Sequence, residues 1–413
     1  MVGAEIISVG DELLIGQVEN TNASWMARQL NDAGIKVIRI NTISDDRLQI
    51  ISALTEAGKR AEVILITGGL GPTRDDITKE VLCEFFDSKL VFNEDVFRHI
   101  QELFQLRGYD VNRLNQSQAE IPSNCLPIPN HHGTAPGMWF EKENKIYVSM
   151  PGVPFEMQPM MTNHVIPEVL MRFSTGAIVH RTLLTQGIPE SILAQTIEEW
   201  ERKIPENIKL AYLPQPGMVR LRLSAYGKNR ETLQQQIEKE SEKLMALIPE
   251  VIFGYDEDTL EAIIGKLLIE GAQTLSTAES CTGGYLAHLI TSVPGSSAYF
   301  RGSVVAYAND IKEHHLGVHA DTLKEYGAVS KPVVMEMADG VRKRFSTDYA
   351  IAISGIAGPD GGTPEKPVGT TWIALATPQN IITGVYKLGE NRQRNIRKAA
   401  LAGLGMLWKE IKR

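Results

Sequence analysis

Residues 276–284 read Ser-Thr-Ala-Glu-Ser-Cys-Thr-Gly-Gly, and this polar stretch decides how the last third of the chain is organised. The segment before it, Gly271–Leu275, is predicted to be a strand, and a long helical pattern begins at Gly283. The N-terminus of a helix presents unpaired backbone N–H groups that favour a negative ligand. A hydroxyl held there can attack a carbonyl while those groups stabilise the developing charge. In a simpler interpretation, Ser280 or Thr282 only caps the helix.

The length and charge of the chain limit the class of protein. A chain of 413 residues is too long for one core, so two or three domains are expected. Its net charge of −8 argues against direct nucleic-acid binding, because affinity for phosphates comes mainly from Lys and Arg. The three cysteines are too few and too scattered for a disulfide framework or a thiolate zinc site. With no signal peptide at residues 1–10 and no apolar run long enough to span a bilayer, we expect a cytoplasmic protein without a membrane partner.

The first 90 residues alternate between predicted strands and helices. Strands are expected at 4–9, 35–40 and 62–66, and helices at 20–30, 46–59 and 77–86. Such alternation predicts a parallel sheet with helices on both faces, in which ligands bind beyond the carboxyl ends of the strands. The loops 10–12 and 68–76 follow two such ends.

The second of these loops is the more specific signal. Its glycines Gly68, Gly69 and Gly71 allow the backbone to approach a phosphate closely. Asp75 and Asp76 supply carboxylate oxygens, which hydrated divalent cations prefer. The alternative is a glycine-rich turn in which one of the two aspartates caps the next helix. A Walker loop is excluded, because no Gly-Lys-Ser/Thr follows.

Two more glycine-containing loops flank a strand predicted at 145–150. His131 and His132 lie in the first of them, and without a third ligand at a useful spacing we interpret them as loop residues. Glu156 follows the second loop and opens a helix, where the helix dipole favours a carboxylate.

Residues 175–252 read as a small α+β module. Strands are predicted at 179–186, 208–213 and 219–226, and helices at 189–203 and 229–248. The module lacks an obvious Gly-x-x-Gly clamp for RNA, and its Glu- and Lys-rich faces are typical of solvated surfaces. We interpret it as a spacer or dimerisation unit.

In the last third, several predicted strands end in polar, glycine-rich loops. Helices are predicted at 258–270 and 392–410, and strands at 303–307, 349–354, 368–376 and 381–388. The loop 354–363 offers backbone N–H groups to a phosphate or a ribose. Arg392 and Arg397 on the last helix could clamp a phosphate, although arginines at such positions are often solvated.

A serine is inert at neutral pH without a base. The histidines of this region are scattered over predicted helices and turns, at His288, His314, His315 and His319. Lys312 follows a strand end, and a lysine partly desolvated in a pocket can lose its proton and serve as the base. Its alternative is an ordinary surface lysine. Cys281 is the rival nucleophile to Ser280, although a buried thiol facing away would be inert.

Three motifs in the first third resemble the amino-terminal domain of the CinA family. They are Gly10-Asp11-Glu12-Leu13-Leu14, Thr67-Gly68-Gly69-Leu70-Gly71-Pro72-Thr73 with Asp75-Asp76-Ile77-Thr78, and Met150-Pro151-Gly152-Val153-Pro154 with Glu156-Met157. The resemblance implies a fold like that of the molybdopterin-binding MogA and MoeA domains and a metal-dependent ADP-ribose pyrophosphatase activity. It implies catalytic Glu12 and Asp76, metal ligands Asp11, Asp75 and Asp76, and substrate contacts from Gly10, Asn22, Gly68, Gly69, Thr73 and Glu156.

The last third resembles the carboxy-terminal domain of the same family, which in stand-alone form is the nicotinamide mononucleotide amidohydrolase PncC. The motifs are 278–284, Tyr307-Ala308-Asn309 with Lys312 and Leu316-Gly317-Val318, and 354–359 through Gly369-Thr370. The resemblance implies deamidation without a cofactor, with Ser280, Lys312 and Tyr307 as catalytic residues. The implied substrate contacts are Glu279, Thr282, Gly283, Asn309, Ser354, Gly355, Ala357, Gly358, Gly361, Gly369, Arg392 and Arg397.

These observations predict an α/β protein of three domains. A doubly wound MogA/MoeA-like domain is expected at 1–170, a KH-like linker domain at 175–253 and a deamidase domain at 256–413. We expect a bifunctional hydrolase of nicotinamide mononucleotide and ADP-ribose, with Mg, Mn or Co at the first site, and a homodimer. The alternative is a molybdopterin- or nucleotide-binding protein, or a competence accessory, with one or both sites inactive.

Overall fold

The chain forms two compact units, one of residues 1–179 with 225–236 and the other of residues 180–224 with 237–413. The computed structural model describes residues 2–106 and 108–412. None of the helices in this described part combines the length and the apolar character needed to cross a bilayer.

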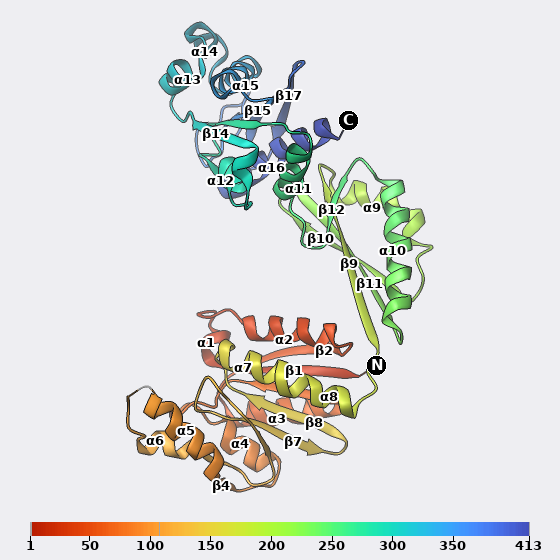
Figure 1. Ribbon diagram of the computed structural model, residues 1–413, viewed down its shortest axis with the longest axis vertical. Helices are drawn as coiled ribbons and strands as arrows, with labels where there is room; N and C mark the ends of the chain where they lie inside the picture. Colours follow the sequence, from red (N-terminus) through yellow and green to blue (C-terminus); the bar gives the residue numbers. More distant parts are fainter. Residues whose placement is uncertain (1, 107, 413) are drawn as a thin grey trace. The chain divides into compact units, whose positions relative to one another are not determined.

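A six-stranded sheet in the order β2-β1-β3-β8-β7-β6 forms the centre of the first unit (Figure 1). The strands are β1 (Gly3–Val9), β2 (Lys36–Ile43), β3 (Val63–Thr67), β6 (Leu126–Ile128), β7 (Gly137–Lys142) and β8 (Lys145–Met150). β2, β1, β3 and β8 are parallel, whereas β7 is antiparallel to β8 and β6 is antiparallel to β7. The predicted parallel sheet is therefore confirmed, with an antiparallel edge that the sequence did not reveal.

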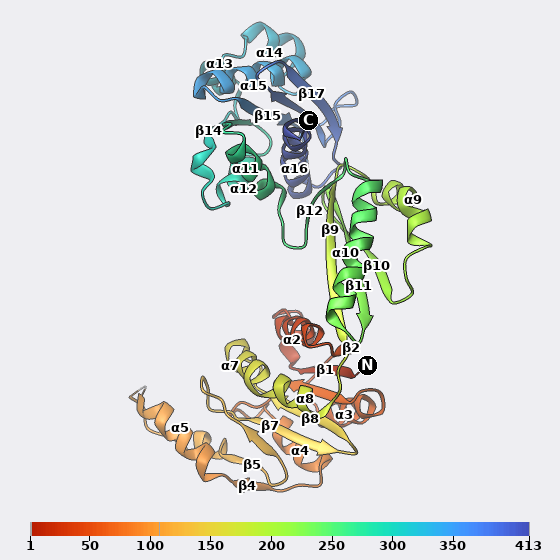
Figure 2. The same ribbon diagram turned by 45° about the vertical axis from the view of Figure 1, so that its right-hand side comes forward.

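Helices cover both faces of this sheet because both faces of its strands are apolar. In β1, Ile7 and Val9 face α3 (Arg47–Arg60) and α4 (Thr78–Phe85). Ala4 and Ile6 face the opposite layer of helices, which is seen in Figure 2. This layer consists of α2 (Thr21–Asp32), α7 (Pro154–Met160), the π-helix η1 (Met161–Val165) and α8 (Ile166–Arg172). The remaining elements are α1 (Asp11–Leu14), β4 (Leu90–Phe92), α5 (Glu94–Leu106), α6 (Arg113–Ser117) and β5 (Glu120–Pro122).

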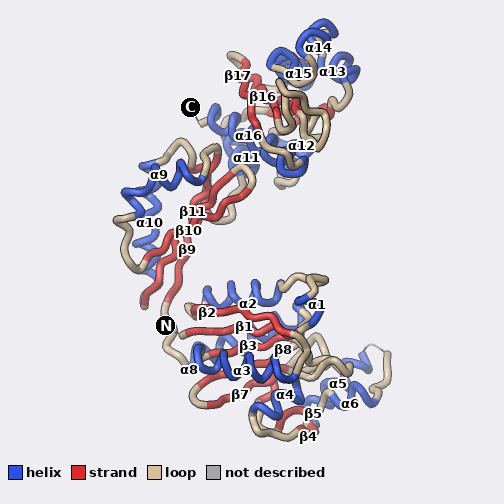
Figure 3. The backbone as a smooth tube through the Cα atoms, turned by 180° about the vertical axis from the view of Figure 1, so that it is seen from behind, coloured by secondary structure: helices blue, strands red, loops and turns tan. Residues whose placement is uncertain are grey.

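The middle module is the α+β unit that the sequence predicted. Its sheet has the order β10-β11-β9-β12, drawn in red in Figure 3. The elements are β9 (Ala177–Gln186), α9 (Glu190–Glu201), β10 (Ile208–Gln215), β11 (Met218–Gly227), α10 (Arg230–Leu247) and β12 (Ile252–Tyr255). Leu184 of β9 and Phe253 of β12 pack into the same core as Trp408, near the C-terminus.

The last sheet has the order β14-β13-β15-β16-β17, with β13 parallel to both of its neighbours. The strands are β13 (Leu275–Glu279), β14 (Phe300–Val305), β15 (Tyr349–Gly355), β16 (Thr370–Ala376) and β17 (Ile381–Lys387). α11 (Leu260–Glu270), α12 (Tyr285–Thr291) and α16 (Arg392–Ile411) pack on one face. α13 (Asn309–Leu316), α14 (Ala320–Tyr326) and α15 (Lys331–Phe345) pack on the other, over a layer of strand alanines. A 3-10 turn, η2 (Ser296–Ala298), precedes β14.

The strand and helix boundaries around residue 280 correct two predictions. The strand is Leu275–Glu279 rather than 271–275, and all five of its residues are buried. Two of its polar side chains find partners inside the fold: the Ser276 hydroxyl lies 2.7 Å from that of Thr347, and Glu279 accepts from backbone N–H groups, whereas the buried Thr277 hydroxyl has no partner in the described chain. The helix begins at Tyr285 and is short, because Gly283 and Gly284 have φ of 59° and 96°, outside the helical region.

Candidate active sites

Ser280 lies in a sharp turn between the central strand β13 and α12. Its backbone N–H donates to the carbonyl of Ile353 on β15 at 2.9 Å, which continues the sheet by one residue. The N–H of Gly283 then donates to the carbonyl of Ser280 at 3.1 Å and closes the turn. The turn therefore places the buried Ser280 at the carboxyl end of the strand, where α/β sheets bind ligands.

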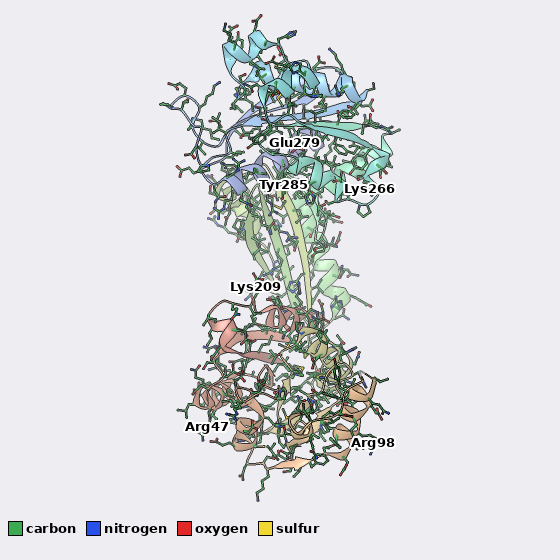
Figure 4. The ribbon with its side chains drawn as sticks, turned by 90° about the vertical axis from the view of Figure 1, so that its left-hand side faces the viewer. Arg47, Arg98, Lys209, Lys266, Glu279 and Tyr285 are labelled. Carbon is green, nitrogen blue, oxygen red and sulfur yellow. The ribbon has the colours of Figure 1, made fainter. Side chains whose placement is uncertain are left out.

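Glu279, the last residue of β13, caps α12 with its side chain (Figure 4 labels it beside Tyr285). One carboxylate oxygen accepts from the N–H groups of Gly284 at 3.1 Å and Leu286 at 2.9 Å, and the other accepts from Ala287 at 2.7 Å. The side chain is 0% exposed. Both oxygens accept hydrogen bonds within the fold, and the prediction that Glu279 contacts substrate stays a prediction.

The same contacts correct the prediction that the N-terminus of α12 stabilises an oxyanion, because Glu279 already occupies those N–H groups. The N–H of Tyr285 donates to the carbonyl of Thr282 at 3.0 Å. In this turn, the amides of Cys281 and Thr282 are those that remain. The Thr282 hydroxyl is also buried and has no hydrogen-bond partner in the described chain.

Lys312 is a buried lysine in the second turn of α13. It is 1% exposed, and its ammonium group donates to the carbonyl of Ala306 at 2.8 Å. Burial lowers the pKa of Lys312, and the Cys281 thiol and Asp310 oppose that shift. Ala306 follows Val305, which pairs with Glu279 across β13 and β14, so the ammonium group of Lys312 lies at the strand end that continues into Ser280. Within the described residues no hydrogen bond joins Lys312 to Ser280, so their catalytic pairing stays a prediction.

Cys281 is buried and packs against the strand end opposite. A Cβ added to Gly355 would lie 3.0 Å from its Sγ, so only a glycine leaves room for the thiol there. Burial raises the pKa of Cys281 to about 12. The thiol is therefore neutral at physiological pH, which makes it a poor nucleophile.

Arg392 joins the strand end of β14 to the glycine-rich loop after β15. Its guanidinium donates to the hydroxyl of Tyr307 at 2.9 Å and to the carbonyl of Gly358 at 2.8 Å. Tyr307 is exposed, so both groups border solvent. The structure thus brings three of the predicted site residues together.

Hydrogen bonds with neighbouring segments anchor the loop 355–369 and the end of the strand before it. The buried Ser354 hydroxyl donates to the carbonyl of Ala328 at 2.7 Å, and its predicted contact with substrate stays a prediction. Gly358, Gly361 and Gly369 all have φ between 87° and 90°, a region that favours glycine. Asn395, which we did not predict, donates to the carbonyls of Ala357 at 3.0 Å and Gly389 at 2.8 Å.

A pocket of about 640 Å³ lies beside the start of α12. Thr282, Gly283 and Arg397 line it, so these three predicted residues share one cavity, whereas Arg392 lies with Tyr307. Asn309 is exposed at the first position of α13.

In the first unit, a cavity of about 610 Å³ lies at the carboxyl ends of the parallel strands. The predicted residues that line it are Gly10, Glu12, Asn22, Gly68, Gly69, Asp75, Asp76 and Glu156. Asp11 donates its N–H to Asp45 at 3.2 Å, and Thr73 donates to Asp76. The loops 10–12 and 68–76 therefore meet at one site, as their positions after parallel strands indicated.

Asp45 is a cavity residue that the sequence analysis missed. It follows β2, so the rule that ligands bind beyond strand ends could have found it. Burial raises the pKa of Asp45, and the charges of Asp11, Glu12 and Asp76 raise it further, while the Asp11 amide opposes the shift. Three carboxylates thus act on Asp45, and Asp75 is not among them. A hydrogen bond from Thr73 lowers the pKa of Asp75.

The donor set of this cavity fits a hydrated divalent cation. Within residues 2–106 and 108–412, no group of three or more His, Cys, Asp or Glu residues is arranged to hold a metal ion. Mg²⁺ commonly binds through one or two carboxylates, several waters and substrate phosphates. Asp45 and Asp76, with Asp11 and Glu12 nearby, offer carboxylate oxygens of that kind.

Packing explains two of the glycines that the sequence analysis assigned to phosphate approach. A Cβ added to Gly68 would lie 2.1 Å from the carbonyl of Val9, and one added to Gly69 would lie 2.1 Å from the hydroxyl of Thr78. Their φ values of 110° and 65° also favour glycine. The fold requires both residues whether or not a phosphate binds.

The amide side chains of Asn22 and Asn130 hold residues that line the cavity, Gly152 and Glu156, by hydrogen bonds. Asn22 donates to the carbonyl of Gly152 at 2.6 Å, and its Oδ1 is buried without a partner in the described chain. Asn130, which we did not predict, donates to Glu156 at 2.7 Å and accepts from the N–H groups of His132 and Gly133. The loop at 130–135 is therefore folded around Asn130, and Glu156 is held by that loop.

Family models match three consecutive segments of the chain. Residues 5–171 match the "Probable molybdopterin binding domain", residues 180–254 the "Damage-inducible protein CinA KH domain", and residues 257–411 the "CinA C-terminal domain".

Full-length relatives carry the same three segments. A CinA-like protein of Cytophaga hutchinsonii is 48% identical over 409 residues, covering 99% of this chain and 98% of that protein. A CinA-like protein of Flavobacterium psychrophilum is 46% identical over 410 residues, covering 99% and 98%. The crystal structure of the competence/damage inducible protein CihA from Agrobacterium tumefaciens is 33% identical and covers 38% of this chain and 98% of that chain, with a TM-score of 0.36.

The capping role of Glu279 predicts the effect of replacing it. Glu279→Gln keeps the shape of the side chain but turns an amide NH₂ toward backbone N–H donors. The free energy of unfolding, measured in urea, should therefore fall by about 1–3 kcal/mol. Glu270→Gln, on the exposed end of α11, is the control and should leave stability unchanged. A Glu279→Gln protein as stable as the parent would contradict the capping role.

Proposed function

This chain belongs to the CinA family, and we propose that it is a hydrolase with two active sites. The site around Ser280 would deamidate nicotinamide mononucleotide to nicotinate mononucleotide and ammonia. The site around Asp45 and Asp76 would hydrolyse the diphosphate of ADP-ribose. The observation that carries the proposal is the buried Lys312 beside the turn that presents Ser280.

The deamidation uses Ser280 as nucleophile and Lys312 as base. The Ser280 oxygen bonds to the carboxamide carbon while its proton passes to the neutral amine of Lys312. The amides of Cys281 and Thr282 are the free donors of the turn, and they stabilise the negative oxygen of the intermediate. The C–N bond then breaks, ammonia leaves with the proton returned by Lys312, and water hydrolyses the acyl ester.

The substrate has a phosphate that the surrounding arginines can bind. Arg397 lines the pocket beside Thr282 and Gly283, at the same turn as the nucleophile. Arg392 is held by Tyr307 and Gly358, so its orientation is fixed before substrate binds. Preorganised guanidinium groups of this kind suit a phosphate, which accepts two hydrogen bonds at once.

The amino-terminal cavity suits a diphosphate with a divalent cation. Asp45 and Asp76 would hold the cation, which would neutralise the phosphate charge during hydrolysis. Glu12 lines the cavity and is the candidate to orient the attacking water. Asn22, with its unpartnered oxygen, and Glu156 line the remaining wall and would contact the substrate.

The alternative function of this cavity is to bind a ligand without converting it. The family model that matches residues 5–171 is described as a molybdopterin binding domain. A pterin or nucleotide that binds in the cavity and is recovered unchanged would favour this reading for the first unit alone.

The nucleophile can be identified by comparing two adjacent substitutions. Ser280→Ala should lower ammonia release from nicotinamide mononucleotide by roughly a thousandfold or more, because no other group forms the acyl bond. Cys281→Ala should keep most of the activity, since the buried thiol is neutral. Loss of activity in Cys281→Ala alone would reject the assignment.

The amino-terminal site should depend on metal, and the other site should not. EDTA is expected to stop ADP-ribose hydrolysis while ammonia release continues. Asp45→Asn should raise the metal concentration needed for half-maximal hydrolysis by about 10-fold or more. Asp46→Asn is a matched control, because Asp46 caps α3 through Gln49 and asparagine caps equally well. Hydrolysis of ADP-ribose that EDTA does not affect would reject a metal at this site.

A further inference from the structure

Gln118 is a buried residue in the wall of the amino-terminal cavity that the proposed reactions leave without a role. It lies between α6 and β5, in the segment coloured orange in Figure 1. It lines the cavity of about 610 Å³ and is 5% exposed. Polar groups in such a wall commonly fix the orientation of a ligand.

The backbone on both sides of Gln118 is held by neighbouring segments. The carbonyl of Ser117 accepts from the Nζ of Lys79 at 2.8 Å. The carbonyl of Ala119 accepts from the N–H of Asn93 at 2.9 Å. The position of the Gln118 side chain is therefore set by the fold before any ligand binds.

The side-chain amide of Gln118 is unpaired at both ends. Its Oε1 is buried and has no hydrogen-bond partner in the described chain. Its Nε2 also has no partner within residues 2–106 and 108–412, and unlike the oxygen it is not shielded from solvent. Buried amides are normally hydrogen-bonded, and leaving one unpaired lowers stability. Because Gln118 lines the cavity, its Nε2 is available to a ligand there.

Leu70 and Ala135 flank Gln118 in the cavity wall. Their exposed fractions are 8% and 7%, and all three residues also line a small adjoining cavity. Among the described residues, no Asp or Glu lines this smaller cavity, whereas the carboxylates of the larger one lie around Asp45. Lys79 is the charged residue there, and its Nζ already donates to a backbone carbonyl. A single amide between apolar side chains suits the edge of a neutral planar ring better than a phosphate.

We propose that Gln118 recognises the base of the nucleotide that binds in this cavity, which is the adenine of ADP-ribose. The identity of this ligand rests on the proposed hydrolysis of ADP-ribose. The Nε2 of Gln118 donates to a ring nitrogen of the base, whose plane lies against Leu70 and Ala135. Gln118 thus positions and selects the substrate and takes no part in breaking the diphosphate bond.

The test is hydrogen exchange by mass spectrometry on the full chain with Mg²⁺, in which the loop 68–76 reports on this cavity. Its slowing with rising AMP or ribose 5-phosphate gives a dissociation constant for each, and the parent should bind AMP more tightly by about tenfold or more. Gln118→Met keeps the length of the side chain and removes the amide. It should weaken AMP binding by about tenfold and leave ribose 5-phosphate unchanged. Without ligand, its urea midpoint should equal or exceed that of the parent, because methionine leaves no polar group unpaired.

Gln116→Met, at an exposed position of α6, is the matched control and should bind both ligands as the parent does. Equal protection by AMP and ribose 5-phosphate, unchanged AMP affinity in Gln118→Met, or a lower urea midpoint in that variant would overturn the proposal. A pterin that binds through Gln118 more tightly than AMP would overturn the assignment to adenine. Absence of ADP-ribose hydrolysis would reject the proposed reaction alone, since these dissociation constants do not depend on turnover.

Discussion

Exclusion of water from the turn after β13 is the constraint on which the proposed deamidase site depends. Burial acts on two neighbouring groups, and it moves both toward their neutral forms. It raises the pKa of the Cys281 thiol to about 12 and lowers the pKa of the Lys312 ammonium. The same environment keeps the thiol in its protonated form and makes the amine of Lys312 easier to deprotonate. In the proposed deamidation, this amine would act as the base and Ser280 as the nucleophile.

The geometry of that turn rests on Glu279. A buried carboxylate is stable only when hydrogen bonds replace its water, and three backbone N–H groups do so here. This arrangement engages the N–H groups at the start of α12, so the proposed mechanism relies on the amides of Cys281 and Thr282 instead. The amino-terminal site has the opposite character, since the negative charges of Asp11, Glu12 and Asp76 act on Asp45 and raise its pKa.

Much of the fold could be predicted from the sequence, because apolar runs and alternating elements mark most strands and helices. β13 was misplaced because its buried residues are polar and find partners only in three dimensions, as Ser276 does with Thr347. In the sites, motif residues predicted Ser280, Lys312 and the glycine loops. Asp45 was missed although its position after β2 could have indicated it, whereas Asn130 and Asn395 were missed because their contacts with Glu156 and Ala357 join segments far apart in the sequence. Gly68 and Gly69 were predicted, but their tight packing could be seen only in the structure.

The most direct test is the ionisation of Lys312 itself. Carbon-13 NMR of lysine-labelled protein, with the Lys312 signal assigned by a Lys312→Arg variant, gives its pKa in the folded chain. The account predicts a value below the ordinary lysine value of about 10.4, and the same ionisation in the pH profile of kcat/KM for ammonia release. A Lys312 that titrates at or above the ordinary value would contradict a neutral amine acting on Ser280.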